Sequence, residues 1–314
     1  MRRRKGRAID GILVLDKPIG LSSNRALQRS KGIYEAQKAG HTGNLDPLAT
    51  GVLPICFGEA TKFSQYLLDA DKTYEATIKL GVQTTTGDVE GEVLETSDTS
   101  HIQLADIQAI LPQFLGQIEQ VPPMYSALKV DGQPLYKLAR QGIVIERKSR
   151  EVTINSLSLD AFRAGEFAEI DITVSCSKGT YIRTLGEDIA KALGDLGGHL
   201  TRLHRTQSGQ FTMAQSISLE QLNSLKDSEG FAALDGLLIA PEEAVNHLPV
   251  VEITEKAGYH VQLGQAVLVA NTTIVGMTRI RQENGVFLGI GEVNQQGTLA
   301  PRRLLANVKT LASL

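Results

Sequence analysis

One segment restricts the backbone of this chain more than any other: residues 40–51, which read GHTGNLDPLATG. The glycines at positions 40, 43 and 51 allow backbone conformations that are barred to other residues. Pro47 fixes its own φ and pushes Asp46 out of the helical region. The segment therefore predicts a stiff loop with small neighbours, on which the Asp46 carboxylate can be approached. An Asp before a Pro is also typical of a helix N-cap, and that alternative stays open.

The length of 314 residues exceeds what one core usually supports, so we expect two domains. No run of about 18 apolar residues occurs, and the N-terminus lacks an apolar signal segment, which argues against a membrane span and against secretion. Cys56 and Cys176 lie in apolar contexts and are expected to be buried thiols in a reducing compartment. Neither has metal-ligand spacing. We therefore expect a cytoplasmic protein without a metal site.

Basic residues gather in two places although the net charge is only −3. The first is the N-terminal tail at positions 2–7, which is typical of a solvated chain end. The second is residues 121–150, which contain six basic and two acidic residues and so carry a net charge of +4. The basic residues include Lys129, Lys137 and Arg140. This second segment follows Val121-Pro122-Pro123 and contains an Asp-Gly hairpin signal. It is expected to be an insertion that projects from the body.

Hydrophobic periodicity predicts alternating strands and helices up to about residue 245. The expected strands are 9–15, 52–57, 73–82, 152–162, 168–176, 199–206 and 210–213, and the expected helices are 22–34 (with Ser22 or Ser23 as N-cap), 61–68, 104–115 and 182–193, with further helix signals near 218 and 232. After Pro249, short strands separated by glycines predict a small β-rich unit, expected to be a barrel. We place the domain boundary near Asn246.

Three side chains are candidates for chemistry. Asp46 supplies a carboxylate, Tyr74 lies on a strand soon after the Asp46 loop, and Arg183 follows Gly179 at a strand-to-helix junction. An Arg beside an Asp favours the charged carboxylate and can orient it. Spacing alone does not require such a site, because Arg183 can equally be a surface residue of its helix and Tyr74 a core aromatic.

Taken together, the segments resemble a known family. Residues 40–51 look like the catalytic motif of the TruB type of tRNA pseudouridine synthase. Asp16-Lys17-Pro18 with Gly20, Ser22 and Ser23 resembles its N-terminal motif, Lys72-Thr73-Tyr74 its tyrosine strand, and residues 177–183 (SKGTYIR) its arginine motif. The stretches Gly289-Ile290-Gly291 and Ala300–Leu304 are similar to the PUA domain of the bacterial members. The match runs in order over nearly the whole chain, so the combined motifs are highly specific.

This resemblance implies an α+β fold: a mixed, mainly antiparallel sheet flanked by helices in residues 1–246, and a PUA-like RNA-binding barrel in residues 247–314. It implies that uridine 55 in the tRNA T-loop is isomerised to pseudouridine, after the base is flipped out of the loop. Isomerisation needs no redox agent or group donor, which fits the lack of cofactor motifs. The implied partner is tRNA alone, with the protein a monomer that needs no protein partner, and the segment 121–150 is expected to clamp the phosphate backbone.

Individual roles follow from matching positions. Asp46 matches the catalytic aspartate, Arg183 the arginine that pairs with it, and Tyr74 the tyrosine that stacks on the target base and helps to remove the C5 proton. Further matches are expected near the substrate: His41 where a side chain fills the gap left by the flipped base, Tyr181 and Leu203 in the nucleotide pocket, and Lys17 packing near the catalytic loop. The order of steps at Asp46 is left open.

Two positions depart from the family pattern. Asn44 stands where Ala, Thr or Ser is usual, and its amide is placed to hydrogen-bond with Asp46. His204 stands where Arg is usual, which is expected to weaken one phosphate contact. Neither residue belongs to the expected chemistry.

Other functions remain open on the sequence alone. A tRNA-folding factor that holds the elbow without chemistry would not need the Asp46, Tyr74 and Arg183 set. A guide-RNA-dependent pseudouridylase shares the catalytic core and the PUA unit, but would not need a basic insertion to grip its own substrate. An Asp-dependent glycosidase would need a second acidic residue across the bond, and no candidate is evident.

Overall fold

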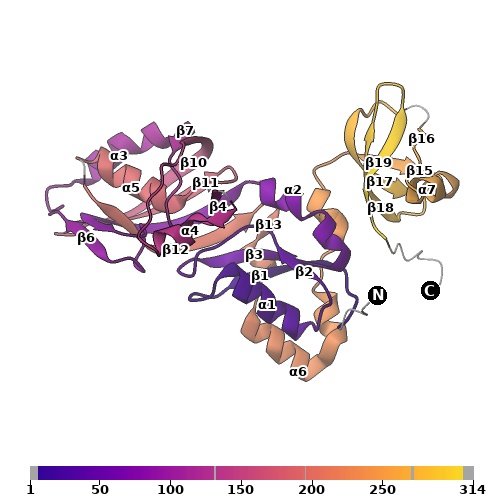
Figure 1. Ribbon diagram of the computed structural model, residues 1–314, viewed down its shortest axis with the longest axis horizontal. Helices are drawn as coiled ribbons and strands as arrows, with labels where there is room; N and C mark the ends of the chain where they lie inside the picture. The colour runs from indigo at the N-terminus through magenta and orange to yellow at the C-terminus, as the bar shows by residue number, and fades with distance from the viewer. Residues whose placement is uncertain (1–5, 131, 195, 270–271, 307–314) are drawn as a thin grey trace.

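The computed structural model describes residues 6–130, 132–194, 196–269 and 272–306. Residues 2–5 of the basic tail and Asp131 of the expected hairpin lie outside these ranges. The molecule is elongated, with a large sheet domain at one end and a small C-terminal unit at the other (Figure 1). Within the described ranges, none of the helices combines the length and the apolar character needed to cross a membrane.

The large domain is organised around one mixed sheet of ten strands. The path runs β14-β1-β3-β12-β4-β11-β10-β7, with β2 on β3 and β13 on β12. The bounds are β1 Gly11–Lys17, β2 Ala39–His41, β3 Thr50–Phe57, β4 Lys72–Leu80, β7 Gly116–Gln120, β10 Arg150–Arg163, β11 Glu169–Cys176, β12 Gly198–Ser208, β13 Phe211–Thr212 and β14 Ile217–Ser218. The β1·β14 and β3·β12 pairs are parallel and the others are antiparallel, which confirms the expected sheet type.

Helices cover this sheet and close its core. They are α1 Ser23–Ile33, α2 Ser64–Asp69, α3 Leu104–Ile110, α5 Ile182–Ala192 and α6 Leu219–Gly236, with short 3₁₀ turns η1 Gly58–Lys62, η2 Leu111–Phe114, η3 Met213–Gln215 and η4 Pro241–Val245. Ser22 caps α1 by accepting from the backbone of Arg25, as one of the two expected caps. Helix α5 buries Ile182, Leu185 and Ile189 against the sheet, as its spacing predicted. The two expected thiols, Cys56 and Cys176, are buried and free.

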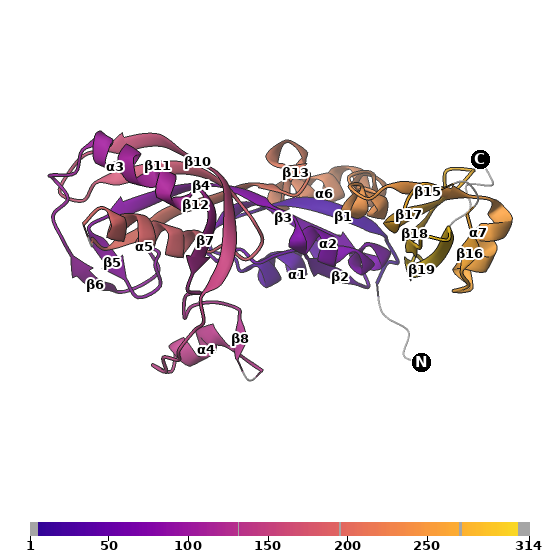
Figure 2. The same cartoon turned by 90° about the horizontal axis from the view of Figure 1, so that it is seen from above.

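Two small hairpins extend from the sheet. One is β5 Val82–Thr84 with β6 Val93–Thr96, and the other is β8 Lys129–Val130 with β9 Gln133–Pro134, followed by α4 Leu135–Ala139. Figure 2 shows β8 and α4 projecting from the body between β7 and β10. The expected basic insertion is therefore confirmed as a projection.

The C-terminal unit holds a five-stranded sheet in the order β15-β17-β18-β19-β16. Its elements are β15 Val250–Ile253, α7 Glu255–Gln262, β16 Val267–Leu268, β17 Gly276–Gln282, β18 Phe287–Val293 and β19 Thr298–Leu304. It has its own apolar cluster around Val261, Ile280 and Leu288. In the large domain, the strand predicted at 199–206 is slightly longer and forms β12 over residues 198–208, with β-bulges against β4.

Candidate active site

The segment between β2 and β3 forms an irregular loop and not a helix start. Residues 43–49 contain no helical turn, so the N-cap alternative for Asp46 is wrong. Ser23 holds the loop from α1: its Oγ accepts from the Leu45 backbone N–H at 2.7 Å and donates to the Leu45 carbonyl at 3.1 Å. The Thr42 N–H also donates to the Pro54 carbonyl at 3.1 Å. Asp46 is thus presented on an anchored loop.

Gly51 explains why this loop ends on a glycine. Its φ is +97°, and a Cβ at this position would lie 2.3 Å from the carbonyl oxygen of Arg205 on β12. Only a residue without a side chain allows β3 and β12 to approach in this way. The same contact places Arg205 opposite both Gly51 on β3 and Tyr74 on β4. The pairing brings the loop and the tyrosine strand to the same part of the sheet.

Arg183 lies in the first turn of α5, close behind the N-cap Tyr181, and its guanidinium contacts the loop. Its Nη2 is 2.9 Å from Oδ2 of Asp46 and also donates to the Tyr125 carbonyl at 2.8 Å. Its Nη1 donates to the Thr86 carbonyl at 2.7 Å. The Arg183 side chain is only 5% exposed, whereas that of Asp46 is 41% exposed. The carboxylate is therefore held from behind by a buried cation and still faces an incoming molecule.

Asp88 is a further member of this cluster that sequence reasoning missed. Its Oδ2 lies 3.7 Å from Nε of Arg183, and the side chain is almost fully buried. Oδ1 accepts from the Thr86 hydroxyl at 2.6 Å and from the Glu90 N–H at 3.0 Å, which fixes the carboxylate. In the sequence, Asp88 belongs only to a polar turn region, and no signal there distinguishes it. One guanidinium is thus shared between two carboxylates.

The environment shifts the ionisation of these groups. Burial raises the pKa of the Asp46 carboxyl, the nearby Asp88 charge adds to the rise, and the Arg183 guanidinium opposes it. The sequence-based expectation considered only the arginine, so the rise is a correction to it. Burial likewise raises the pKa of the Tyr74 phenol. Arg183 therefore opposes the protonation of Asp46 that its burial and the Asp88 charge favour.

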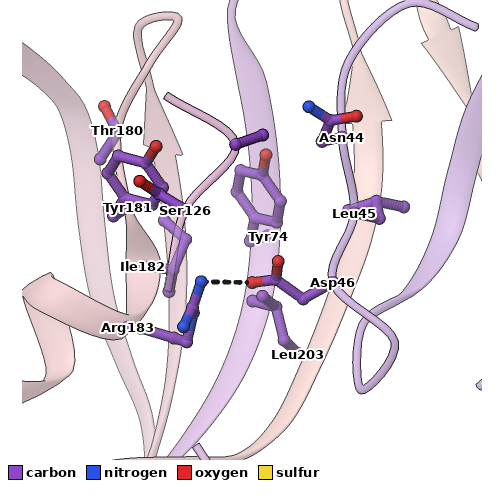
Figure 3. A pocket seen from close by; sticks show the side chains of 11 residues that line it. Asn44, Leu45, Asp46, Tyr74, Ser126, Thr180, Tyr181, Ile182, Arg183 and Leu203 are labelled. Atoms are coloured by element: carbon purple, nitrogen blue, oxygen red, sulfur yellow. Dashed lines mark ion pairs between the residues drawn. The ribbon is translucent and has the colours of Figure 1, made fainter. Parts of the chain in front are cut away.

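A cavity of about 120 Å³ opens beside the ion pair. Its lining includes Asp46, Tyr74, Tyr181, Arg183 and Leu203, so five of the expected site residues meet at one place. Figure 3 shows the Tyr74 ring standing above the Asp46–Arg183 pair, with Leu203 below it. A larger cavity of about 550 Å³ continues from Asp46 under the projecting insertion. The remaining members of the two linings come from the loop, the insertion, the start of α5 and residues 22–24 and 86–90.

Other expected site residues lie outside the small cavity. His41 ends β2, is half-buried and lines neither cavity. Lys17 has no exposed surface, and its Nζ donates to the carbonyls of Leu21 at 2.6 Å and Pro18 at 3.0 Å. Burial lowers the pKa of Lys17 to about 8. Lys17 is therefore held inside the protein, opposite Gly51 across β1 and β3, and it lines neither cavity.

The three basic side chains expected to bind RNA are exposed on the insertion. Lys129 lies on β8, Lys137 on α4, and Arg140 directly after α4, where it lines the larger cavity. The Arg140 guanidinium lies 5.6 Å from the centre of the Tyr136 ring.

The two residues that depart from the family pattern, Asn44 and His204, both lie near the site. Asn44 lines both cavities. Among the described residues it makes no hydrogen bond with Asp46, against expectation. His204 lies within 2.7 Å of the Thr50 hydroxyl.

Comparison with known proteins decides the family. The model described as "TruB family pseudouridylate synthase (N terminal domain)" matches residues 31–182, and two TruB C-terminal models match residues 183–246 and 249–305. The tRNA pseudouridine synthase B of Pseudomonas putida F1 is 52% identical over 96% of this chain and 98% of its own length. The protein of the same name from Pseudomonas aeruginosa UCBPP-PA14 is 53% identical over the same shares. The chain belongs to the TruB family of pseudouridylate synthases.

Solved structures share the fold of this TruB-family chain. A chain from a Cbf5-Nop10-Gar1 complex matches with a TM-score of 0.69 and 27% identity, covering 96% of this chain and 84% of that one. A chain from an H/ACA RNP bound to a substrate RNA containing 2′-deoxyuridine matches with a TM-score of 0.71 and 24% identity, covering 95% and 86%. The expected fold class, with its catalytic core and PUA-like unit, is thereby confirmed.

Proposed function

We propose that this protein isomerises uridine 55 in the T-loop of tRNA to pseudouridine. The observation that carries the proposal is the Asp46–Arg183 pair, exposed on its carboxylate side in a cavity that suits one extruded base. It occurs in a chain about half identical to tRNA pseudouridine synthases B over nearly its whole length. Within the described residues, no group of His, Cys, Asp and Glu side chains is placed to hold a metal ion.

The reaction exchanges one bond to the sugar for another. Asp46 attacks the nucleotide, the bond between ribose C1′ and N1 breaks, and the base rotates. A new bond then forms between C1′ and C5, and the bond to Asp46 breaks, which returns the free carboxylate. The proton leaves C5 and N1 takes up a proton, so the atoms balance without any donor. Arg183 holds the carboxylate and favours its charged form. No redox agent or cofactor enters.

The other pocket residues bind the base. Tyr74 stacks on the extruded uracil and takes part in removing the C5 proton, while Tyr181 and Leu203 enclose the ring. Extrusion costs a few kcal/mol, and His41 recovers part of this by stacking in the gap that the base leaves in the T-loop. Because His41 lies apart from the small cavity, it is suited to contact the RNA rather than the flipped base.

The remaining surfaces bind the tRNA. The projecting insertion clamps the phosphate backbone of the T-arm through Lys129, Lys137 and Arg140. It recognises the shape of the A-form RNA helix rather than its sequence. We assign residues 1–246 to the catalytic domain and residues 247–314 to a PUA-like RNA-binding domain. The enzyme acts in the cytoplasm as a monomer, without an obligatory protein partner.

One assay tests this function. The purified protein is incubated with a bare tRNA transcript, and the modified position is mapped. We expect pseudouridine at position 55 and at no other uridine, without added guide RNA or protein. Stable binding without any modification would instead support a folding factor. Activity only with an added guide RNA or protein complex would support the guide-dependent class.

A further inference from the structure

Ser126 carries a buried polar atom that the structure leaves without a partner. The residue is 4% exposed, and its Oγ makes no hydrogen bond with any described residue. Buried hydroxyl groups in folded proteins nearly always have a partner, and one that lacks it destabilises the protein. Ser126 also lines both cavities at the ion pair. A molecule bound in these cavities would therefore supply the missing hydrogen-bond partner of Ser126 Oγ.

The backbone around Ser126 is fixed to the catalytic cluster. Its N–H donates to the Met124 carbonyl at 2.9 Å, and its carbonyl accepts from the Tyr136 N–H at 3.1 Å. The preceding carbonyl, of Tyr125, accepts from the same Nη2 of Arg183 that contacts Asp46. With both backbone groups satisfied, the hydroxyl is the hydrogen-bonding group of Ser126 that remains for a ligand.

The place of Ser126 in the cavity matches the far edge of a bound base. Figure 3 shows Ser126 and Tyr181 on one side of Tyr74, with Asn44 and Leu45 on the other and Asp46 below. A serine side chain has three staggered rotamers, so one rotation about χ1 turns Oγ from the protein toward the cavity. A base whose C6 and C1′ lie at Asp46 presents its opposite, polar edge away from that carboxylate.

We propose that Ser126 contacts the substrate, its hydroxyl donating a hydrogen bond to a carbonyl oxygen of the extruded uracil. The inference rests on the proposed function and adds a base-reading residue to it. The chemistry of the reaction makes a hydroxyl suitable. Rotation of the detached ring about its N3–C6 axis exchanges N1 with C5 and C2=O with C4=O, and leaves N3–H in place. The ring therefore shows the same carbonyl, N–H, carbonyl edge before and after rotation, and one donor serves both.

The test is a cycle of enzyme and substrate changes. Ser126→Ala is compared with wild type on T-arm hairpins that carry uridine, 2-thiouridine or 4-thiouridine at the target position, since sulfur is a weaker acceptor than oxygen. Single-turnover rates and dissociation constants are both measured, so the cycle can be read even where a thio substrate is not converted. Ser208→Ala is the matched control, because Ser208 is also buried and its Oγ also lacks a partner among the described residues, but it lines neither cavity.

For uridine we expect Ser126→Ala to reduce the rate or the affinity about threefold to tenfold, the range for one neutral hydrogen bond. The reduction in affinity should shrink toward none with the thio substrate whose sulfur faces Ser126 before rotation, and Ser208→Ala should behave as wild type. An unchanged Ser126→Ala enzyme, or the same reduction on all three hairpins, would overturn the proposal. Wild type that forms no pseudouridine at all would instead refute the proposed function, so the two failures are distinguishable.

Discussion

Replacing Arg183 with Met should move the acid limb of the pH–rate profile to higher pH. Arg183 opposes the rise in the pKa of Asp46 that burial causes. Without the guanidinium that pKa rises further, so the carboxylate becomes protonated at a higher pH and turnover fails earlier as pH falls. Arg183→Lys keeps the positive charge but not the planar fork, and should lie between the two.

The size of the effect follows from the geometry. Opposite charges 2.9 Å apart attract by about 1.4 kcal/mol in a water-like dielectric and by about 6 kcal/mol at an effective dielectric of about 20. Because 41% of the Asp46 side chain is exposed, we take the lower figure as the minimum. A loss of about 1.4 kcal/mol in Arg183→Met lowers the ratio of carboxylate to carboxylic acid at Asp46 about tenfold at a given pH.

The assay is the single-turnover rate on a tRNA transcript between about pH 5 and 9. Arg183→Met also removes donors from the carbonyls of Thr86 and Tyr125, so thermal unfolding and tRNA affinity are measured on the same preparations. A folded variant whose rate falls equally at every pH would refute the reasoning, because Arg183 would then position Asp46 without setting its charge.

Three further outcomes are expected. Neutralising Lys129, Lys137 and Arg140 together should lower the slope of log affinity against log salt by about 0.7–0.9 for each phosphate group that is left without its cation, and an unchanged slope would show that the insertion does not touch phosphate. Activity should survive EDTA in correctly folded tRNA, whereas rescue by one specific transition metal would contradict this. Gly51→Ala should destabilise the fold by more than the ~1 kcal/mol expected of Gly20→Ala. Both glycines have positive φ, but only at Gly51 would the added Cβ lie 2.3 Å from a backbone atom, the Arg205 carbonyl oxygen. Equal melting temperatures of the two variants would contradict this packing.

The sequence predicted those parts of the site that depend on local patterns. The loop glycines and the Asp-Pro pair place Asp46, and the Gly179 turn before an amphipathic helix places Arg183. Strand alternation places Tyr74 on one face of β4. These local signals alone left Arg183 open as a surface residue and Tyr74 as a core aromatic, and it was the resemblance of the combined motifs to the TruB family that joined the three residues into one expected site.

The sequence did not reveal the residues whose roles arise from long-range pairing. Asp88 reaches Arg183 because its turn docks on β12, where the N–H of Val89 donates to the carbonyl of Leu200 at 3.1 Å. Nothing in the polar turn indicates that docking. The position of Ser126 in the cavity depends in the same way on how the insertion folds back, with the Tyr136 N–H donating to the Ser126 carbonyl. Lys17 could be placed near the loop but not identified as fully buried, since a lysine at a strand end is usually exposed.

The most direct test of the central claim is tritium release by Asp46→Asn. Joining C5 to the ribose expels the hydrogen on C5, so tRNA labelled with tritium at uridine C5 of the T-loop reports the reaction itself. Asn keeps the size of Asp46 and much of its hydrogen bonding but lacks the charge and the nucleophile. We predict that wild type releases the label and that Asp46→Asn, folded and binding tRNA with unchanged affinity, releases none. Release by Asp46→Asn at a rate near that of wild type would show that Asp46 is not the catalytic group.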